Sequence, residues 1–317
     1  MRPPNLPNPG RPFDAVSFGY NSVDYLCLLA AHPPADAKVP MEAFARQGGG
    51  QAATAAATLA RLGWKTRYLG KFGDGDEGRF ARESLVAEGV DVAACRIASG
   101  VRNQTAVIWA ARREAARTVA YLREPGLEIA PGEIAVEHAV AGAVLLLDGH
   151  HLPISVEFAH AARQAGIPVL LDAGKPAPGM AELLELTDYV LCDERFAPAY
   201  TGESDQRRAL AAIAARHRTP FVAATLGPRG SLALVGGRFV ETPAFAVDVT
   251  DTTGAGDVWH GAFAAGLLRG FDGEEILRYA AGAAALKCRS LGGRAGIPTP
   301  AELEDFLRHA VPHVEAN

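Results

Sequence analysis

Short apolar runs alternate with longer amphipathic stretches along most of the chain. The apolar or β-branched runs lie at 15–19, 66–70, 143–147, 168–172, 189–192 and 221–225. Between them, the stretches 51–62 and 154–165 keep an apolar stripe, and each is followed by a glycine of the kind that ends helices. Such alternation is typical of a parallel sheet between layers of helices. We therefore predict an α/β fold, with a doubly wound, mostly parallel sheet and helices on both faces.

Two segments, at about 27–47 and 96–124, interrupt this alternation. Within the second, the runs 105–109 and 118–122 have the pattern of strands that flank a charged turn. Strands inserted between the units of a doubly wound fold would form a small β-sheet lid over the carboxyl ends of the main strands, where ligands bind. We predict a flexible tail at 1–12, followed by one domain at 13–317 that carries this lid.

The composition excludes several classes of protein. The chain has 317 residues, of which 49% are hydrophobic and 21% charged, and its formal net charge is −5. This is enough for a large core, and it argues against a nucleic-acid-binding surface or a disordered chain. No apolar run approaches the length of a membrane span, and the proline-rich start lacks the apolar region of a secretory signal. The expected partners are small molecules, not nucleic acid or a membrane.

The cysteines point to the cellular compartment. They are far apart and form no C-x-x-C pair, which argues against a metal cluster or a disulfide framework. We expect reduced core thiols in a cytoplasmic protein. The four residues are Cys27, Cys95, Cys192 and Cys288.

The segment DTTGAGD, which ends at Asp257, indicates the chemistry. Its small residues let the backbone approach a ligand closely, and the first N–H groups of the helix that follows point at that ligand. The N–H groups of Gly254, Ala255 and Gly256, together with the helix dipole, would stabilise a phosphoryl group. Asp257, at the edge of this site, could accept the proton of an attacking hydroxyl, as phosphoryl transfer to an alcohol requires.

The alternative is that Asp251 and Asp257 only cap a helix, but the joint pattern of acidic, hydroxyl and small residues favours the functional interpretation. With the small-residue-rich helix that follows, the segment resembles the C-terminal signature of the PfkB (ribokinase-like) carbohydrate kinases. The resemblance covers nearly the whole chain beyond the first dozen residues. It implies Mg²⁺-dependent transfer of the ATP γ-phosphate to a hydroxyl of a sugar or sugar derivative, with Asp257 as the base.

A second set of residues resembles the family's acceptor site. Gly48, Gly49 and Gly50 precede the first predicted helix. A tight loop is the alternative for such a run, but its position resembles that of a glycine pair in the family, which lets sugar hydroxyls reach backbone N–H groups. Thr54 stands where the family commonly has asparagine, so a hydroxyl replaces a side-chain amide or the contact is lost. Asp24 follows the first strand and could accept hydrogen bonds from two vicinal hydroxyls. A capping or solvated aspartate is the alternative, and the family's sugar-binding aspartate favours the first role.

Three stretches look closest to the sulfofructose kinase branch of the family: GGGQAAT, VDVTDTTGAGD and GGRAGIP. Lys38 fits a lysine that this branch uses near an anionic head group. Arg102, Asn103 and Arg123 are candidates for recognising an anionic or hydroxylated tail. A fructose-type sugar or an anionic ketose such as 6-sulfofructose is therefore one expected acceptor.

The nucleotide side rests on the same resemblance. Thr225, Gly227 and Gly230 form a T-x-G-x-x-G segment like the one that binds nucleotide in the family. The alternative is an ordinary turn after a strand, but its position after a strand expected to neighbour the DTTGAGD turn favours the nucleotide. Gly282 belongs to a stretch that resembles the helix bordering the adenine, and simple helix packing is the alternative there.

Metal binding is the least determined feature of the sequence. Asp193, a candidate for the nucleotide site, and Glu194 occupy the place of the family's N-x-x-E motif, which is absent. They could hold Mg²⁺ through water, or form a solvated acidic turn. In the family, the loop that starts at the equivalent of Asp251 often supplies carbonyl oxygens to a monovalent cation such as K⁺, which makes Asp251 a candidate metal residue.

Two other functions and one assembly state remain as expectations. A nucleoside kinase of the same fold would differ in its acceptor pocket. A non-catalytic sugar- or nucleotide-binding regulator would retain the fold, but it would have no need of a base at Asp257. Lid strands in this family often pair between subunits, and the apolar run 105–109 would benefit from being covered, so we expect a homodimer.

Overall fold

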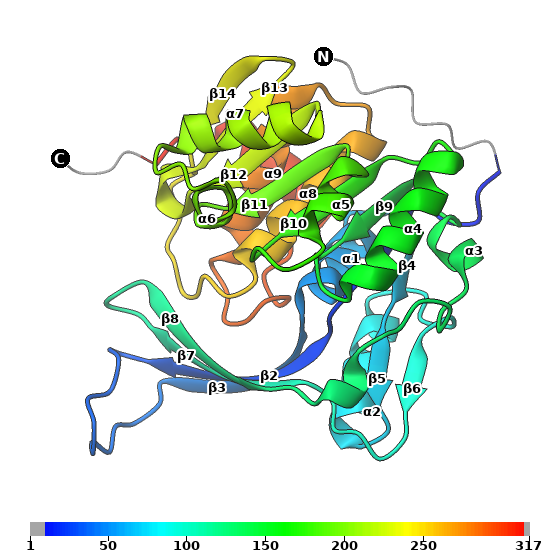
Figure 1. Ribbon diagram of the computed structural model, residues 1–317. Helices are drawn as coiled ribbons and strands as arrows, with labels where there is room; N and C mark the ends of the chain where they lie inside the picture. Colours follow the sequence, from blue (N-terminus) through cyan, green and yellow to red (C-terminus); the bar gives the residue numbers. More distant parts are fainter. Residues whose placement is uncertain (1–9, 314–317) are drawn as a thin grey trace.

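A computed structural model describes residues 10–313, and a twisted sheet runs through the middle of it (Figure 1). Within these residues the sheet has eight strands in the order β14-β13-β12-β11-β10-β9-β1-β4. Neighbouring strands from β12 to β4 are parallel, and β13 and β14 add an antiparallel hairpin at one edge. The strands are β1 (Ala15–Phe18), β4 (Thr66–Leu69), β9 (Val144–Leu147), β10 (Val169–Ala173), β11 (Tyr189–Asp193), β12 (Phe221–Thr225), β13 (Ser231–Val235) and β14 (Arg238–Thr242).

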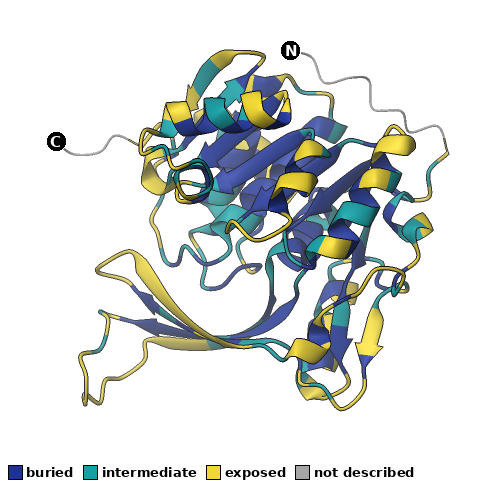
Figure 2. Cartoon of the chain, viewed as in Figure 1, coloured by how far each residue is buried: buried dark blue, intermediate teal, exposed yellow. Residues whose placement is uncertain are grey.

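Helices cover both faces of this sheet, and each face has its own hydrophobic core. The parallel strands are buried on both sides, which explains why they appear in the sequence as unbroken apolar runs (Figure 2). One face carries α1 (Gln51–Arg61), α8 (Ala255–Leu268) and α9 (Gly273–Lys287), with α10 (Pro300–His309) packed on α9. The other carries α3 (Val136–Ala139), α4 (Leu152–Gln164), α5 (Met180–Glu185), α6 (Phe196–Thr201) and α7 (Gln206–His217).

A second, four-stranded sheet forms the lid. Its strand order is β3-β2-β7-β8, and it lies across the carboxyl ends of the main strands in Figure 1. The strands are β2 (Ser22–Leu29), β3 (Ala43–Gly49), β7 (Thr105–Ala111) and β8 (Ala116–Leu122). The lid sheet thus begins earlier than the predicted segment 27–47, and the stretch 30–42 within that segment is a loop.

The remaining elements within residues 10–313 are a two-stranded sheet, one helix and two short turns. The start of the predicted segment 96–124 belongs to another sheet, in which β6 (Arg96–Ala98) pairs with β5 (Lys71–Gly73) beside α2 (Asp76–Ala87). Two short 3₁₀ turns, η1 (Pro125–Leu127) and η2 (Gly227–Arg229), complete the list of helical elements in the described chain.

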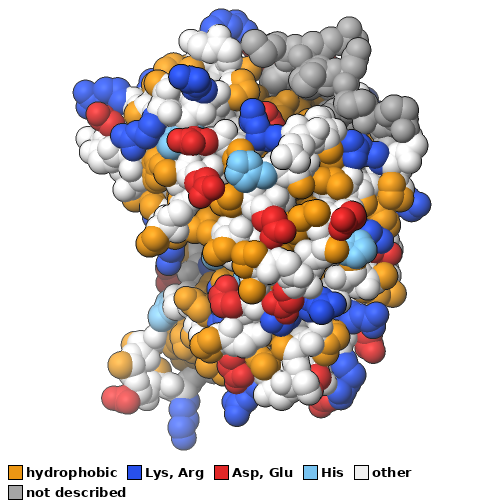
Figure 3. All heavy atoms as spheres, turned by 45° about the vertical axis from the view of Figure 1, so that its right-hand side comes forward, with side chains coloured by type: hydrophobic (Ala, Val, Ile, Leu, Met, Phe, Trp, Pro, Cys, Tyr) orange, Lys and Arg blue, Asp and Glu red, His pale blue; other side chains and the backbone are white. Residues whose placement is uncertain are grey.

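The predicted α/β fold and lid are confirmed, with strand and helix ends within about two residues of those expected. No helix in residues 10–313 is both long and apolar enough to cross a bilayer. On the face shown in Figure 3, acidic and basic side chains are interspersed, without a basic field. The predicted tail at 1–12 lies mostly outside the described residues, and Arg11, within them, donates hydrogen bonds to the carbonyls of Val140 and Ala165.

Candidate active site

A cleft of about 340 Å³ separates the lid from the carboxyl ends of the main strands. Here β1 is flanked by β4 on one side and β9 on the other, which is the switch point where open α/β sheets bind ligands. The lining comes from the ends of main strands, the starts of two helices and the inner face of the lid. It includes Tyr20, Ser22, Asp24, Gln51, Ile108, Arg117, Asp172, Asp193, Thr225, Gly254, Gly256, Asp257 and His260.

The predicted anion turn lies at the floor of this cleft. Gly254, the residue before α8, has φ of +72°, and a side chain there would meet the Cα of Gly293 at 2.7 Å. Only glycine satisfies both requirements. A Cβ built on Gly256 would meet no atom within 4 Å, so the turn is open there. The N–H of Ala255, predicted to face a ligand, instead donates to the carbonyl of Thr252, which leaves those of Gly254 and Gly256 as the candidates.

Asp257 lines the same cleft on the first turn of α8. Burial raises its pKa to about 7, and the negative charge of Asp172 adds to this, while His260 and Arg117 oppose it. A carboxyl group whose pKa lies near neutrality is suited to accept a proton at physiological pH. Its position supports the predicted role as a base.

A histidine–aspartate pair that the sequence did not single out lies beside Asp257. His260 lies one turn along the same helix, and its Nδ1 is 2.8 Å from Oδ2 of Asp172, with both side chains buried at the cleft wall. Burial lowers the pKa of His260, but Asp172 and Asp257 outweigh that effect, so the net shift is upward. Its Nε2 has no hydrogen-bond partner among the described residues. The spacing of three from Asp257 on a predicted helix could have signalled this residue.

Asp251 organises the turn. Its carboxylate accepts hydrogen bonds from the N–H and hydroxyl of Thr253 and from the N–H of Gly292. Its carbonyl oxygen accepts one from the Nζ of Lys287, at 2.7 Å. The carboxylate and the carbonyl of Asp251 therefore both have hydrogen-bond donors within the protein, and the donor to the carbonyl is the ammonium group of Lys287. This does not fit the expected monovalent cation at Asp251.

On the acceptor side, Asp24 and the glycine turn form one unit. The Asp24 side chain is 7% exposed, accepts a hydrogen bond from Ser22, and has a pKa raised by burial. A Cβ on Gly49 would lie 2.0 Å from Oδ2 of Asp24, so glycine makes room for the carboxylate. A Cβ on Gly48 would meet Ser84 and the guanidinium of Arg294. Gly50 has φ of +91° and lines the cleft.

Arg294 supports the glycine turn through hydrogen bonds, a role that the sequence did not single out. It is buried, and its guanidinium donates to the carbonyl of Gly49 and to the hydroxyl of Ser84. Burial lowers its pKa to about 10. Thr54 lies beside it, with the hydroxyl 3.5 Å from the Arg294 Nε, and is not among the residues that line the cleft.

The residues predicted to meet an anionic tail are not brought together. Lys38 lies exposed in the loop between β2 and β3, and Arg102 is exposed and paired with Glu124. Asn103 is buried, where its side chain accepts from the N–H of Gly73. Arg123 lies over the ring of Tyr20 and is paired with Glu128.

Arg117 lines the cleft, and the sequence did not single it out. It projects from β8 of the lid, and its guanidinium donates to the hydroxyl of Thr252 at 3.1 Å. The lid and the anion turn are thereby linked across the cleft. A positive charge thus lies beside the turn predicted to receive a phosphoryl group.

Two of the predicted nucleotide residues, Asp193 and Thr225, line the cleft at the ends of β11 and β12. Gly227 and Gly230 continue from Thr225 with φ of +61° and +87°. Gly282 lies elsewhere, within α9, where a Cβ would meet side chains of α10. Its position is that of a helix-packing glycine.

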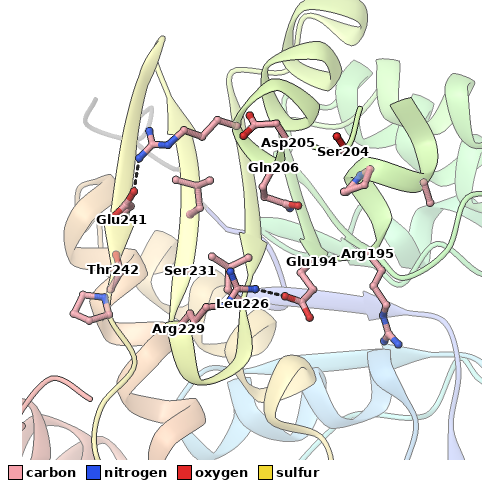
Figure 4. Close-up of a pocket in the computed structure, with 15 residues that line it drawn as sticks. Glu194, Arg195, Ser204, Asp205, Gln206, Leu226, Arg229, Ser231, Glu241 and Thr242 are labelled. Atoms are coloured by element: carbon pink, nitrogen blue, oxygen red, sulfur yellow. Dashed lines mark hydrogen bonds and ion pairs between the residues drawn. The ribbon is translucent and has the colours of Figure 1, made fainter. Parts of the chain in front are cut away.

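Glu194 faces away from the cleft into a larger hollow of about 1130 Å³ between α6, α7 and the β13–β14 hairpin. Figure 4 shows it paired with Arg229 across the near end of this hollow. Asp193 accepts from the N–H groups of Arg195 and Phe196, so it caps the turn before α6. The described chain contains no group of three or more His, Cys, Asp or Glu side chains arranged to hold a metal.

Comparisons with known proteins agree with this geometry. Residues 13–300 match the pfkB family of carbohydrate kinases. The chain is 29% identical to a ribokinase of Bacillus subtilis (strain 168) over 292 residues, which cover 91% of this chain and 97% of the relative.

Two solved structures have the same fold. An Agrobacterium tumefaciens protein superposes with a TM-score of 0.87 at 26% identity, covering 93% of this chain and 97% of that one. Arabidopsis thaliana ribokinase complexed with ribose and ATP superposes with a TM-score of 0.78 at 25% identity, covering 93% and 99%. This chain belongs to the pfkB family of carbohydrate kinases, and it is an ATP-dependent sugar kinase, a phosphotransferase with an alcohol group as acceptor.

Proposed function

We propose that this kinase transfers the γ-phosphate of ATP to a primary hydroxyl of a fructose-type sugar, with 6-sulfofructose as the anionic candidate. The observation that carries the catalytic part is the convergence of Asp257, the open turn at Gly256 and the carboxylate of Asp24 in one cleft. The choice of sugar rests on the GGGQAAT and GGRAGIP stretches. Ribose is the second candidate, because a relative was solved with ribose bound.

In this proposal Asp24 and the turn at Gly48–Gly50 hold the acceptor, and Asp257 takes the proton of its attacking hydroxyl. The N–H groups of Gly254 and Gly256 stabilise the charge on the transferring phosphoryl group, which is the main catalytic contribution in such reactions. The guanidinium of Arg117 adds a positive charge from the lid side. Lid closure would exclude water, which could otherwise react with ATP.

The nucleotide would extend from the anion turn past Thr225 toward Gly227 and Gly230. Bound Mg²⁺ would neutralise phosphate charge, and because this ion keeps most of its waters, it needs no cage of protein ligands. Asp193, which lines the cleft, would hold it through water. Glu194 faces the other side of the Thr225 segment and is paired with Arg229, so it is a weaker candidate.

We propose further that the protein is a cytoplasmic homodimer whose subunits meet through their lids. The four cysteines are free and buried or half-buried, as suits a reducing compartment. On the outer face of the lid, opposite the cleft, Phe44, Val107 and Leu122 are exposed. Exposed apolar side chains on one sheet face are typical of a surface that another chain covers.

The test is phosphoryl transfer from MgATP to a panel of acceptors: fructose, 6-sulfofructose, fructose phosphates, ribose, ketodeoxygluconate and nucleosides. Both ADP and phosphorylated product should be followed. We expect one ketose to give product with the highest kcat/KM. Highest activity with ribose or with a nucleoside would replace the substrate proposal, and nucleotide binding without transfer to any acceptor would contradict the role given to Asp257.

A further inference from the structure

Lys287 is an unusual residue to find in the core. It is fully buried at the last turn of α9. Its Nζ lies 2.7 Å from the carbonyl oxygen of Asp251, the residue that opens the anion turn. A buried ammonium group is costly unless oxygen atoms and negative charge compensate it. The surroundings of this lysine should therefore be built to hold a cation.

The structure supplies that compensation in three ways. The carbonyl of Asp251 accepts a hydrogen bond from the ammonium, and the C-terminal end of α9 carries the negative end of the helix dipole. Burial lowers the pKa of Lys287, and the negative charges of Asp251 and Asp257 oppose this shift without reversing it. The carbonyl, the helix end and the carboxylates form a cation site whose cation is part of the chain.

This site is joined rigidly to the anion turn. The N–H groups of Thr250 and Asp251 donate to the carbonyl of Cys288, directly after Lys287, and the N–H of Gly292 donates to the Asp251 carboxylate. The carbonyl of Asp251 and the N–H of Thr252 belong to one planar peptide unit. A group that fixes the carbonyl therefore also fixes the start of the turn that leads to Gly254 and Gly256.

We propose that the ammonium group of Lys287 takes the place of a monovalent cation at the anion turn, so that this kinase needs neither K⁺ nor Na⁺. Lys287 is a positioning residue: it orients the peptide at Asp251 and adds positive charge behind the turn without touching substrate. The inference rests on the proposed role of the turn in phosphoryl transfer. The two can fail separately, because the role of Asp257 is tested by its own substitution and ion dependence by the composition of the buffer.

The experiment compares the wild-type protein with Lys287→Met, using the tetramethylammonium salt of ATP, Mg²⁺ and the best acceptor. Tetramethylammonium is then the only monovalent cation until KCl or NaCl is titrated in. We expect the wild-type rate to stay constant on addition of K⁺. In Lys287→Met, kcat should fall by roughly tenfold to a hundredfold, as for losses of groups that orient a site, and K⁺ should restore much of it with saturation.

Lys71→Met is the matched control, since Lys71 is also largely buried and paired but is the first residue of β5 and does not line the cleft. It should show no ion dependence. Activation of the wild type by K⁺ would overturn the proposal, as would a folded Lys287→Met protein that is fully active without K⁺, or an inactive one that no alkali cation rescues. Thermal unfolding in K⁺ and in tetramethylammonium tests the variant independently, because K⁺ should raise its midpoint and leave that of Lys71→Met unchanged. If Lys287→Met does not fold, the wild-type titration decides.

Discussion

Several nearby charges influence the pKa of Asp257. It shares the floor of the cleft with Asp172 and His260, and the guanidinium of Arg117 lies nearby. Burial and Asp172 favour the protonated carboxyl group, whereas His260 and Arg117 favour the carboxylate. A base with a pKa near 7 is strong enough to take a proton, and about half of it is ionised at neutral pH.

Replacing Asp257 by Asn keeps the shape of the side chain and removes the base. We expect kcat to fall by roughly two to four orders of magnitude, while the Kd of ATP changes little. Single-turnover rates and calorimetric titration with ATP measure the two quantities. Asp248→Asn, an exposed residue in the loop before the turn, serves as the control. Turnover of Asp257→Asn near the wild-type value would show that another group takes the proton.

The raised pKa also fixes the sign of the pH dependence. Below about pH 7 Asp257 is protonated and cannot accept a proton, so kcat/KM should rise with pH and level off above that value. In His260→Gln the positive charge that stabilises the carboxylate is lost, so the rising limb should move to higher pH. His309→Gln, on exposed α10, should leave the limb in place. An unshifted limb in His260→Gln would mean that the histidine does not influence the base.

At the scale of elements, the end of β3 and the start of α1 depend on small residues. Gly49→Ala places a methyl group 2.0 Å from the Asp24 carboxylate, which must then rotate away. We expect KM for the sugar to rise by about tenfold or more, with KM for ATP nearly unchanged, because a displaced contact weakens acceptor binding alone. Gly75→Ala is the control, since a Cβ there meets its nearest neighbour only at 4.0 Å. Equal changes in both KM values would indicate general disruption of the fold.

The sequence was sufficient for elements whose pattern is local. The strands of the main sheet are unbroken apolar runs, and the anion turn, from Asp251 to Asp257, is a continuous motif. Arg117 could not be predicted, because which residues of β8 face the cleft depends on its register against β7, and a slip of one residue reverses the faces. The roles of Asp172 and Arg294 could not be predicted for a related reason, since their partners come from distant segments. Lys38 fitted a family position and Arg102 was a candidate for an anionic tail, yet the folded chain leaves both exposed outside the cleft.

At the scale of the whole molecule, the exposed apolar side chains on the outer face of the lid predict that a second copy of the chain covers this face. We expect the purified protein to have about twice the 33.2 kDa mass of one chain in sedimentation velocity. Lysine at both Phe44 and Val107 should give a monomer, because charges on an apolar interface oppose its burial. Lysine at Val311, which is more exposed than either residue but follows α10 and is not part of the lid, should leave the dimer intact. A wild-type monomer would contradict the proposal. A dimer that persists with lysine at both Phe44 and Val107 would show that the interface lies outside the lid face.

The close approach of Gly254 to Gly293 carries a consequence for biosynthesis. The turn at Gly254 takes its shape against a loop near the end of the chain, and the N–H of Gly292 holds the Asp251 carboxylate. A nascent chain on the ribosome therefore has its lid and all eight described strands of its central sheet available before its phosphoryl site can form. Catalytic competence should arrive only when the loop at Gly292 and Gly293 has left the exit tunnel.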